Sequence, residues 1–221
     1  MTSAFRRLFL VATPLALAVV LWWHPPGGDE IFADVRHDVD AWLTVHAAFL
    51  LFTPLLGLAA FLLLRGLESR AATVSRVALV FFLVFYTAYE VTVGVGTGIL
   101  VDYANGLPAA EQAVVADAIQ DYNGNAILAD ADPVSVSLIL GFLGWVLAML
   151  AAAVAFRRAG VGWPATLLLA GAALFAIHPP PIGPVGLVCF AAAAVLTERW
   201  RARDARAAAT PAATGGLAPN A

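Results

Sequence analysis

The chain has 221 residues, of which 62% are hydrophobic and 12% charged, with a mean hydropathy of +0.86 and a formal net charge of −3. A soluble globular protein of this size cannot bury that much apolar surface. The net charge says little as a total, because a membrane separates faces of opposite sign, and nucleic acid is not expected as a partner. Cys189 is the only cysteine, which excludes an intrachain disulfide and a metal cage of several thiolates. The composition therefore predicts an all-α membrane protein whose main partner is the lipid bilayer.

Six apolar runs follow one another along the chain, each reaching or approaching the roughly 20 helical residues that cross a hydrocarbon core. They cover about 5–23, 41–64, 77–100, 134–156, 163–177 and 182–197. The last two are short, and the sequence His178-Pro179-Pro180-Pro181 between them is typical of a tight hairpin, because proline ends one helix and can begin the next. The pattern predicts a polytopic transmembrane helical bundle with six spans over residues 1–206.

The arginines alternate with the acidic residues along the chain, in step with the six spans. Eleven of the twelve arginines fall before the first span, between spans two and three, between spans four and five, or after the sixth. The other connections, 24–40 and 101–133, carry five and six acidic residues and only Arg36 as a base. Because basic residues near span ends stay in the cytoplasm, both termini are predicted to be cytoplasmic and the acidic connections to lie outside. We therefore expect a multi-pass protein of the bacterial cytoplasmic membrane.

Two segments are predicted to lie outside the bundle. In 108–122, Val115, Ile119 and Tyr122 recur at helical spacing opposite Asp117 and Asp121, which predicts a short amphipathic helix on the outer side. It either fills a long connection on the surface or covers the end of the bundle. The tail 207–221 is rich in Ala, Pro, Thr and Gly without apolar periodicity, which predicts a disordered cytoplasmic tail.

The four histidines all fall on the predicted outer half of the bundle. His24 follows the first span, His37 lies in the first outer loop, His46 is about one and a half turns into the second span, and His178 follows the fifth. Imidazoles at one depth on several helices are what a zinc, copper or haem site requires, so His24, His46 and His178 are candidate ligands. The alternative is that they are ordinary interfacial histidines, since the sequence has no compact metal-binding motif.

Glu90 is predicted to lie near the middle of the third span, where a carboxylate must face the bundle interior, be protonated or be paired. Tyr86, Glu90, Gly94 and Gly98 share one helical face, which we expect to point inward. Glu90 and Tyr86 are therefore candidates for a proton or cation relay. The alternatives are that Glu90 is a partner to His46 from the neighbouring helix, or that it makes a structural hydrogen bond between helices. Coordination of one ion by Glu90 and His46 together is not expected, because the helix rise separates them in depth unless the spans are offset.

Three functions remain open from the sequence. The first is a membrane protein that binds a metal ion or haem through histidines in its outer half. The second is a small proton-coupled transporter or channel that uses Glu90, and the third is an accessory or assembly protein without a chemical site. The sequence contains no nucleophile elbow, nucleotide-binding loop or catalytic carboxylate pair, so an enzyme is not the favoured interpretation. Glycine-rich faces such as Gly141 and Gly144 predict close helix packing, and a homo-oligomer is left open.

Overall fold

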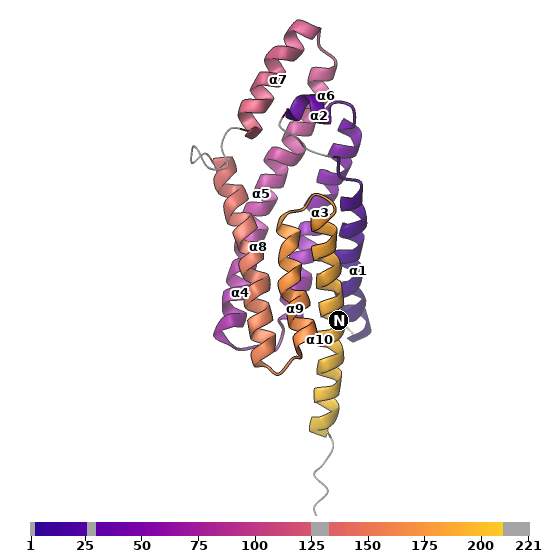
Figure 1. Cartoon of the computed structure of the whole chain (residues 1–221), viewed down its shortest axis with the longest axis vertical. Coiled ribbons are helices and arrows are strands. Elements are labelled where there is room, and N and C mark those ends of the chain that lie inside the picture. The colour runs from indigo at the N-terminus through magenta and orange to yellow at the C-terminus, as the bar shows by residue number, and fades with distance from the viewer. Residues whose placement is uncertain (1–2, 26–29, 125–132, 210–221) are drawn as a thin grey trace, which may run out of the picture.

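The computed structural model describes residues 3–25, 30–124 and 133–209, and within them the chain is all-α (Figure 1). Long helices run up and down a bundle, and shorter ones cap one end. The elements are α1 (Ser3–Trp22), α2 (Ile31–Val35), α3 (Val39–Leu63), α4 (Arg70–Phe81), η1 (Phe82–Tyr86), α5 (Thr87–Tyr89), η2 (Glu90–Gly96), α6 (Thr97–Asn105), α7 (Ala109–Gly124), α8 (Pro133–Arg158), α9 (Trp163–Gly171), η3 (Ala172–Ala176) and α10 (Ile182–Ala209).

Five helices of the described chain are long and apolar enough to cross a membrane, which indicates a multi-pass membrane protein. They cover Ala4–Trp22, Val39–Leu63, Arg70–Asn105, Val136–Arg158 and Ile182–Ala209. The fifth predicted span is a shorter apolar helix, Trp163–Ala176, made of nine α-helical residues followed by five in a 3₁₀ helix. Its length of about 24 Å falls short of a hydrocarbon core of about 30 Å. The turn between this helix and Ile182–Ala209 therefore does not reach as far along the bundle as the ends of the longer helices (Figure 1).

Several helix boundaries differ from the sequence prediction. The third span, predicted as 77–100, is part of a continuous helical rod from Arg70 to Asn105, called here the third rod. It contains two π-helical segments, η1 and η2, in which each turn holds an extra residue. The last helix continues through Ala209, three residues into the predicted tail, whereas 210–221 lie outside the described residues.

The bundle core and the cap have separate apolar clusters. The larger cluster fills the bundle around fully buried side chains such as Phe49, Phe82 and Trp145. The smaller one joins α2, α3, α6 and α7 and consists of Phe32, Val35, Trp42, Val101, Ala104 and Ile119. A helix occupies the region predicted to be amphipathic, and Ile119 is its buried contact while Tyr122 stays 38% exposed. The α2–α6–α7 layer thus lies at one end of the bundle, where the α6–α7 hairpin projects beyond the other helices (Figure 1).

Glycines allow the third rod and α8 to approach closely. A Cβ atom on Gly141 would lie 2.7 Å from the backbone nitrogen of Tyr86, and one on Gly144 would lie 2.6 Å from that of Phe82. Real side chains do not reach such distances, so only glycine fits at these positions. The predicted packing role of Gly141 and Gly144 is confirmed, and this packing fixes the rotation of the rod that carries Tyr86.

Arginines tie the helix ends together at the end of the bundle opposite α7 (Figure 1). Arg6 of α1 and Arg201 of α10 both bind the carboxylate of Glu198, at 2.6 and 2.9 Å. Arg201 also donates to the carbonyl of Leu63 at the end of α3, and Arg76 of α4 donates to the Leu64 carbonyl. We call this the arginine-rich end.

Candidate metal centre

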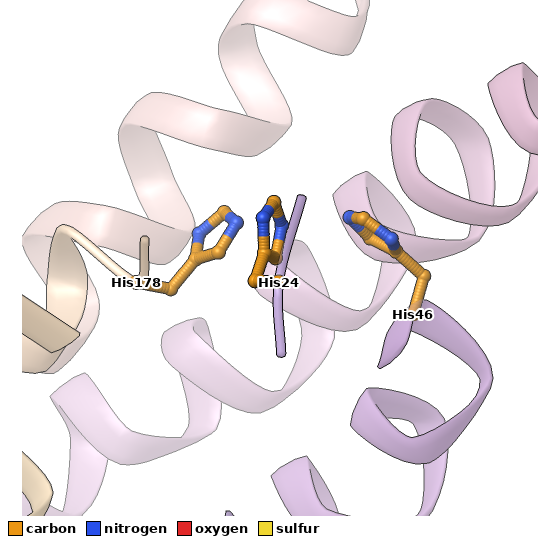
Figure 2. A group of neighbouring side chains, drawn as sticks. All are labelled: His24, His46 and His178. Atoms are coloured by element: carbon orange, nitrogen blue, oxygen red, sulfur yellow. The ribbon is translucent and has the colours of Figure 1, made fainter. Parts of the chain in front are cut away.

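Three histidines that are far apart in the sequence meet beneath the α2–α6–α7 layer. One ring nitrogen from each of His24, His46 and His178 lies within 4.8 Å of the others. The ring centroid of His24 is 4.9 Å from that of His46 and 5.0 Å from that of His178, so His24 lies between the other two (Figure 2). His24 and His46 are 6% and 3% exposed, and His178 is half-buried. His37, by contrast, is exposed and outside this cluster.

Helix ends and a glycine position two of the three imidazoles. His24 follows α1, where Pro25 prevents the helix from continuing. His178 follows η3, and its backbone packs directly against Gly183 in the first turn of α10. A Cβ atom at Gly183 would lie 2.6 Å from the His178 carbonyl carbon, so a glycine is required there. His46, in the second turn of α3, is the only member inside a long helix.

Hydrogen bonds orient all three rings through the same nitrogen. The Nδ1–H of His24 donates to the carbonyl of Pro25 at 2.6 Å, and that of His46 donates to the Trp42 carbonyl at 2.8 Å. Because a carbonyl oxygen only accepts, Nδ1 carries the proton in both rings and Nε2 keeps its lone pair. The Nδ1 of His178 pairs with the Tyr86 hydroxyl at 2.9 Å. Carbonyl and hydroxyl partners of this kind are typical of metal-binding histidines, whose second nitrogen is the ligand.

The histidines outside the spanning helices are in the protonation state that a metal requires. Burial lowers the pKa of His24. Burial lowers the pKa of His178 further, with His24 and His46 adding to the effect. Both imidazoles are therefore neutral at pH 7. The Nε2 of His24 is buried and has no hydrogen-bond partner among the described residues, which leaves its lone pair available.

Glu90 lies beside this cluster, because the spans are offset, which is the condition under which the sequence allowed Glu90 and His46 to meet. Its Oε2 is 3.9 Å from the Nε2 of His46, and the side chain is 1% exposed. Asn105 ends the third rod 15 residues after Glu90, whereas Val39 begins α3 only 7 residues before His46. The rod therefore extends about 12 Å past the start of α3, an offset that brings the two residues to one level.

The carboxylate of Glu90 is poorly satisfied where it lies. Neither oxygen accepts a hydrogen bond of normal geometry from the described residues, although the Tyr86 hydroxyl lies close enough to interact. Tyr86, Glu90, Gly94 and Gly98 are all buried, so the face expected to point inward does so. A buried carboxylate without partners is costly unless a proton or a cation accompanies it.

An aromatic and glycine shell that sequence reasoning missed encloses the cluster. The indole ring of Trp42 lies 4.3 Å from the His46 ring, and its Nε1–H donates to the Gly94 carbonyl at 2.7 Å. Phe49 contacts His178 with ring centroids 5.2 Å apart. Trp42 precedes His46 by four residues, which is the signal that could have placed both on one helix face.

One ring nitrogen from each histidine, together with the carboxylate, could hold a metal ion after a small contraction. In a tetrahedral zinc site, bonds of about 2.0–2.1 Å put the ligand nitrogens about 3.3 Å apart. The separation of up to 4.8 Å between the histidine nitrogens would have to shrink by at most about 1.5 Å, which is within the reach of small ring movements. The buried triad could therefore hold a metal.

Comparison with protein-family models, curated proteins and solved structures finds no match to this chain. The functional assignment therefore rests on the geometry of the histidine cluster.

Proposed function

We propose that this multi-pass membrane protein binds one transition-metal ion through the Nε2 atoms of His24, His46 and His178. The observation that carries the proposal is that three imidazoles, two buried and one half-buried, converge with each Nδ1 already hydrogen-bonded. The Nε2 of His24 is buried without a hydrogen-bond partner, and the Glu90 carboxylate, 3.9 Å from the Nε2 of His46, accepts no hydrogen bond of normal geometry from the described residues. A purely structural role for the rings requires neither feature. A cation between them satisfies both groups, and Glu90 supplies either a fourth ligand or the compensating charge.

Zinc or copper fits this donor set better than other ions. Imidazole nitrogens bind zinc and copper well, whereas magnesium and calcium prefer sites made of oxygen atoms. A haem is disfavoured, because His24 contacts both other rings at centroid distances of 4.9 and 5.0 Å. A porphyrin ligated by two of these rings would have to be inserted between them. Cys189 packs beside Gly171 and is not part of the cluster.

The proposed placement has six crossings, with both termini in the cytoplasm and the ion in the outer half. The arginine-bearing ends of α1, α3, α4 and α10 are joined at one end of the bundle, and the histidines lie toward the other. The short helix α9–η3 and α10 would together form the last two crossings. A reporter fused after Arg206 is expected to be active only on the cytoplasmic side, and activity outside would contradict the placement.

Metal content and affinity test the proposed site. Protein purified in detergent is expected to contain about one zinc or copper ion per chain by elemental analysis, and apo protein is expected to rebind it in calorimetry. The His46→Ala and His178→Ala variants remove ligands and are expected to lower the affinity by about 100-fold or more. His37→Ala is the matched control, because it removes an exposed histidine outside the cluster. Equal affinity in all three variants would refute the site.

Cation transport is the second candidate function, favoured by the burial in a membrane helix of Glu90, whose oxygens accept no hydrogen bond of normal geometry from the described residues. In this case, the histidine cluster would be one cation-binding site along a transport path. Zinc flux into liposomes is expected to fall strongly in Glu90→Gln, which keeps the size of the side chain and removes its charge. Unchanged flux in this variant, or no flux in the parent protein, would reject transport and leave a stationary metal site. An accessory or assembly protein, in contrast, would show no metal binding and no flux at all.

A further inference from the structure

A cavity lies at the arginine-rich end, far from the histidines. It has a volume of about 620 Å³ and is bordered by α1, α10 and the start of α9. Four arginines line it: Arg7, Arg199, Arg203 and Arg206. Arg199 and Arg203 are four residues apart on α10 and therefore project from one face of the helix.

Two of the four arginines that line this cavity, Arg199 and Arg203, carry positive charge without an ion-pair partner among the described residues. Glu198 is its one acidic lining residue, and its carboxylate is bound by Arg6 at 2.6 Å and Arg201 at 2.9 Å, neither of which lines the cavity. Arg7 lies at a longer 3.6 Å from the same carboxylate. The cavity is thus suited to an anion.

The remaining walls of the cavity are apolar and reach the lipid-facing side of the bundle. Val11, Val195 and Leu196 are half-buried lining residues. Trp200 adds an amphipathic ring of the kind found at the level of lipid headgroups. Apolar walls contribute nothing to the binding of a small soluble anion, whereas they would pack against an acyl chain attached to the anion.

We propose that this cavity binds the phosphodiester headgroup of an anionic phospholipid, with an acyl chain along its apolar walls. The guanidinium groups of Arg199 and Arg203 would hold the phosphate oxygens. The start of α9, whose Gly162 N-cap makes no side-chain hydrogen bond, adds a positive helix end to the same cavity. The cavity arginines would then bind a particular class of lipid, in addition to setting the orientation in which the chain inserts into the membrane.

Lipid titration of the detergent-purified full chain, followed by native mass spectrometry, tests this site. We expect phosphatidylglycerol to bind at least about tenfold more tightly than phosphatidylcholine. Since each basic residue near an anionic lipid contributes roughly fivefold, the double variant Arg199→Gln/Arg203→Gln should bind phosphatidylglycerol about 25-fold more weakly. The matched control, Arg70→Gln/Arg158→Gln, removes the same charge from exposed positions at the same end but outside the cavity. It should weaken binding by less than about threefold.

Two outcomes would overturn the lipid site. Equal losses in the two double variants would show a general effect of surface charge, and displacement of the lipid by millimolar inorganic phosphate would show a site for free anions. The unfolding temperature of each variant reports whether it is folded, and both pairs consist of exposed side chains whose loss should leave that temperature unchanged. Because the cavity and the histidine cluster share no residue, failure of one proposal is distinguishable from failure of the other.

Discussion

Replacing Gly94 by alanine should disturb the proposed metal site without removing any ligand. A Cβ atom at this position would overlap the His46 ring, lying 2.8 Å from its Cγ and closer still to its Cδ2. It would also lie 3.0 Å from the Oε2 of Glu90. Ordinary contacts between carbon atoms are about 3.5–4.0 Å, so the ring must move by roughly 1 Å. The ring is held through Nδ1 by the Trp42 carbonyl and cannot simply rotate away.

The size of the effect follows from this forced movement. Overpacking of a buried position costs about 1–3 kcal/mol in the free energy of unfolding. Displacing a ligand ring by about 1 Å resembles the loss of an orienting hydrogen bond, which typically weakens metal affinity by about 10- to 100-fold. Gly94→Ala should therefore reduce both the unfolding free energy and the affinity for zinc.

Gly96→Ala is the matched control for this experiment. It lies two residues further along the same helix, and its Cβ atom would meet only the Tyr122 hydroxyl at 3.4 Å and the Val91 carbonyl at 3.5 Å. Alanine also favours helix over glycine by up to about 1 kcal/mol, so this variant should be as stable as the parent or more so. Denaturant unfolding in detergent and zinc calorimetry provide the two readouts. Equal unfolding free energies and equal zinc affinities in the Gly94→Ala and Gly96→Ala variants would refute the proposed contact between Gly94 and the metal site.

Three further predictions concern groups around the site and at the arginine-rich end. Tyr86→Phe removes the hydroxyl that orients His178, so zinc affinity measured by calorimetry should fall about 10- to 100-fold, and an unchanged affinity would exclude an orienting role. Burial lowers the pKa of His24 and His178 below 6.5, so the unfolded apo protein binds protons more readily. Its unfolding free energy should therefore be highest above pH 6.5 and fall by up to about 1.4 kcal/mol per pH unit for each histidine as the pH drops, and a flat profile from pH 7.5 to 5.5 would contradict this. Glu198→Ala leaves Arg201 without its carboxylate partner and should lower the unfolding free energy by about 2 kcal/mol, whereas parent-like chemical denaturation would show that the ion pair contributes nothing.

The positions of the spanning helices could be predicted from the sequence because a bilayer imposes a minimum length on apolar runs. Five of the six runs are helices of sufficient length, and the run at 163–177 was already recognisable as short. The helix ends were less predictable. The third rod extends beyond both predicted limits, because its polar residues near Arg70 and Asp102 continue the helix outside the apolar run. Hydropathy marks the membrane region of a helix and not its ends.

The individual histidines of the candidate site could be predicted, but not their convergence. His46 lies on α3, whose apolar residues surround the helix on nearly every side, so the sequence does not reveal which face points inward. The vertical offset that brings Glu90 to His46 depends on how far the third rod extends above α3. The π-helical segments add to the difficulty, since each extra residue changes which side chains share a face.

The contact between α1 and α10 has a consequence for biosynthesis. Helix α1 packs against α10, which is synthesised much later, and their charged ends are joined by Arg6 and Glu198. Until residues 182–209 have been made, the face of α1 that contains Leu10 and Leu17 has only part of its partner surface. A chain interrupted before that point is therefore expected to expose this face to lipid or to quality-control proteases. The partner surface of α1 would be complete only after α10 has been synthesised.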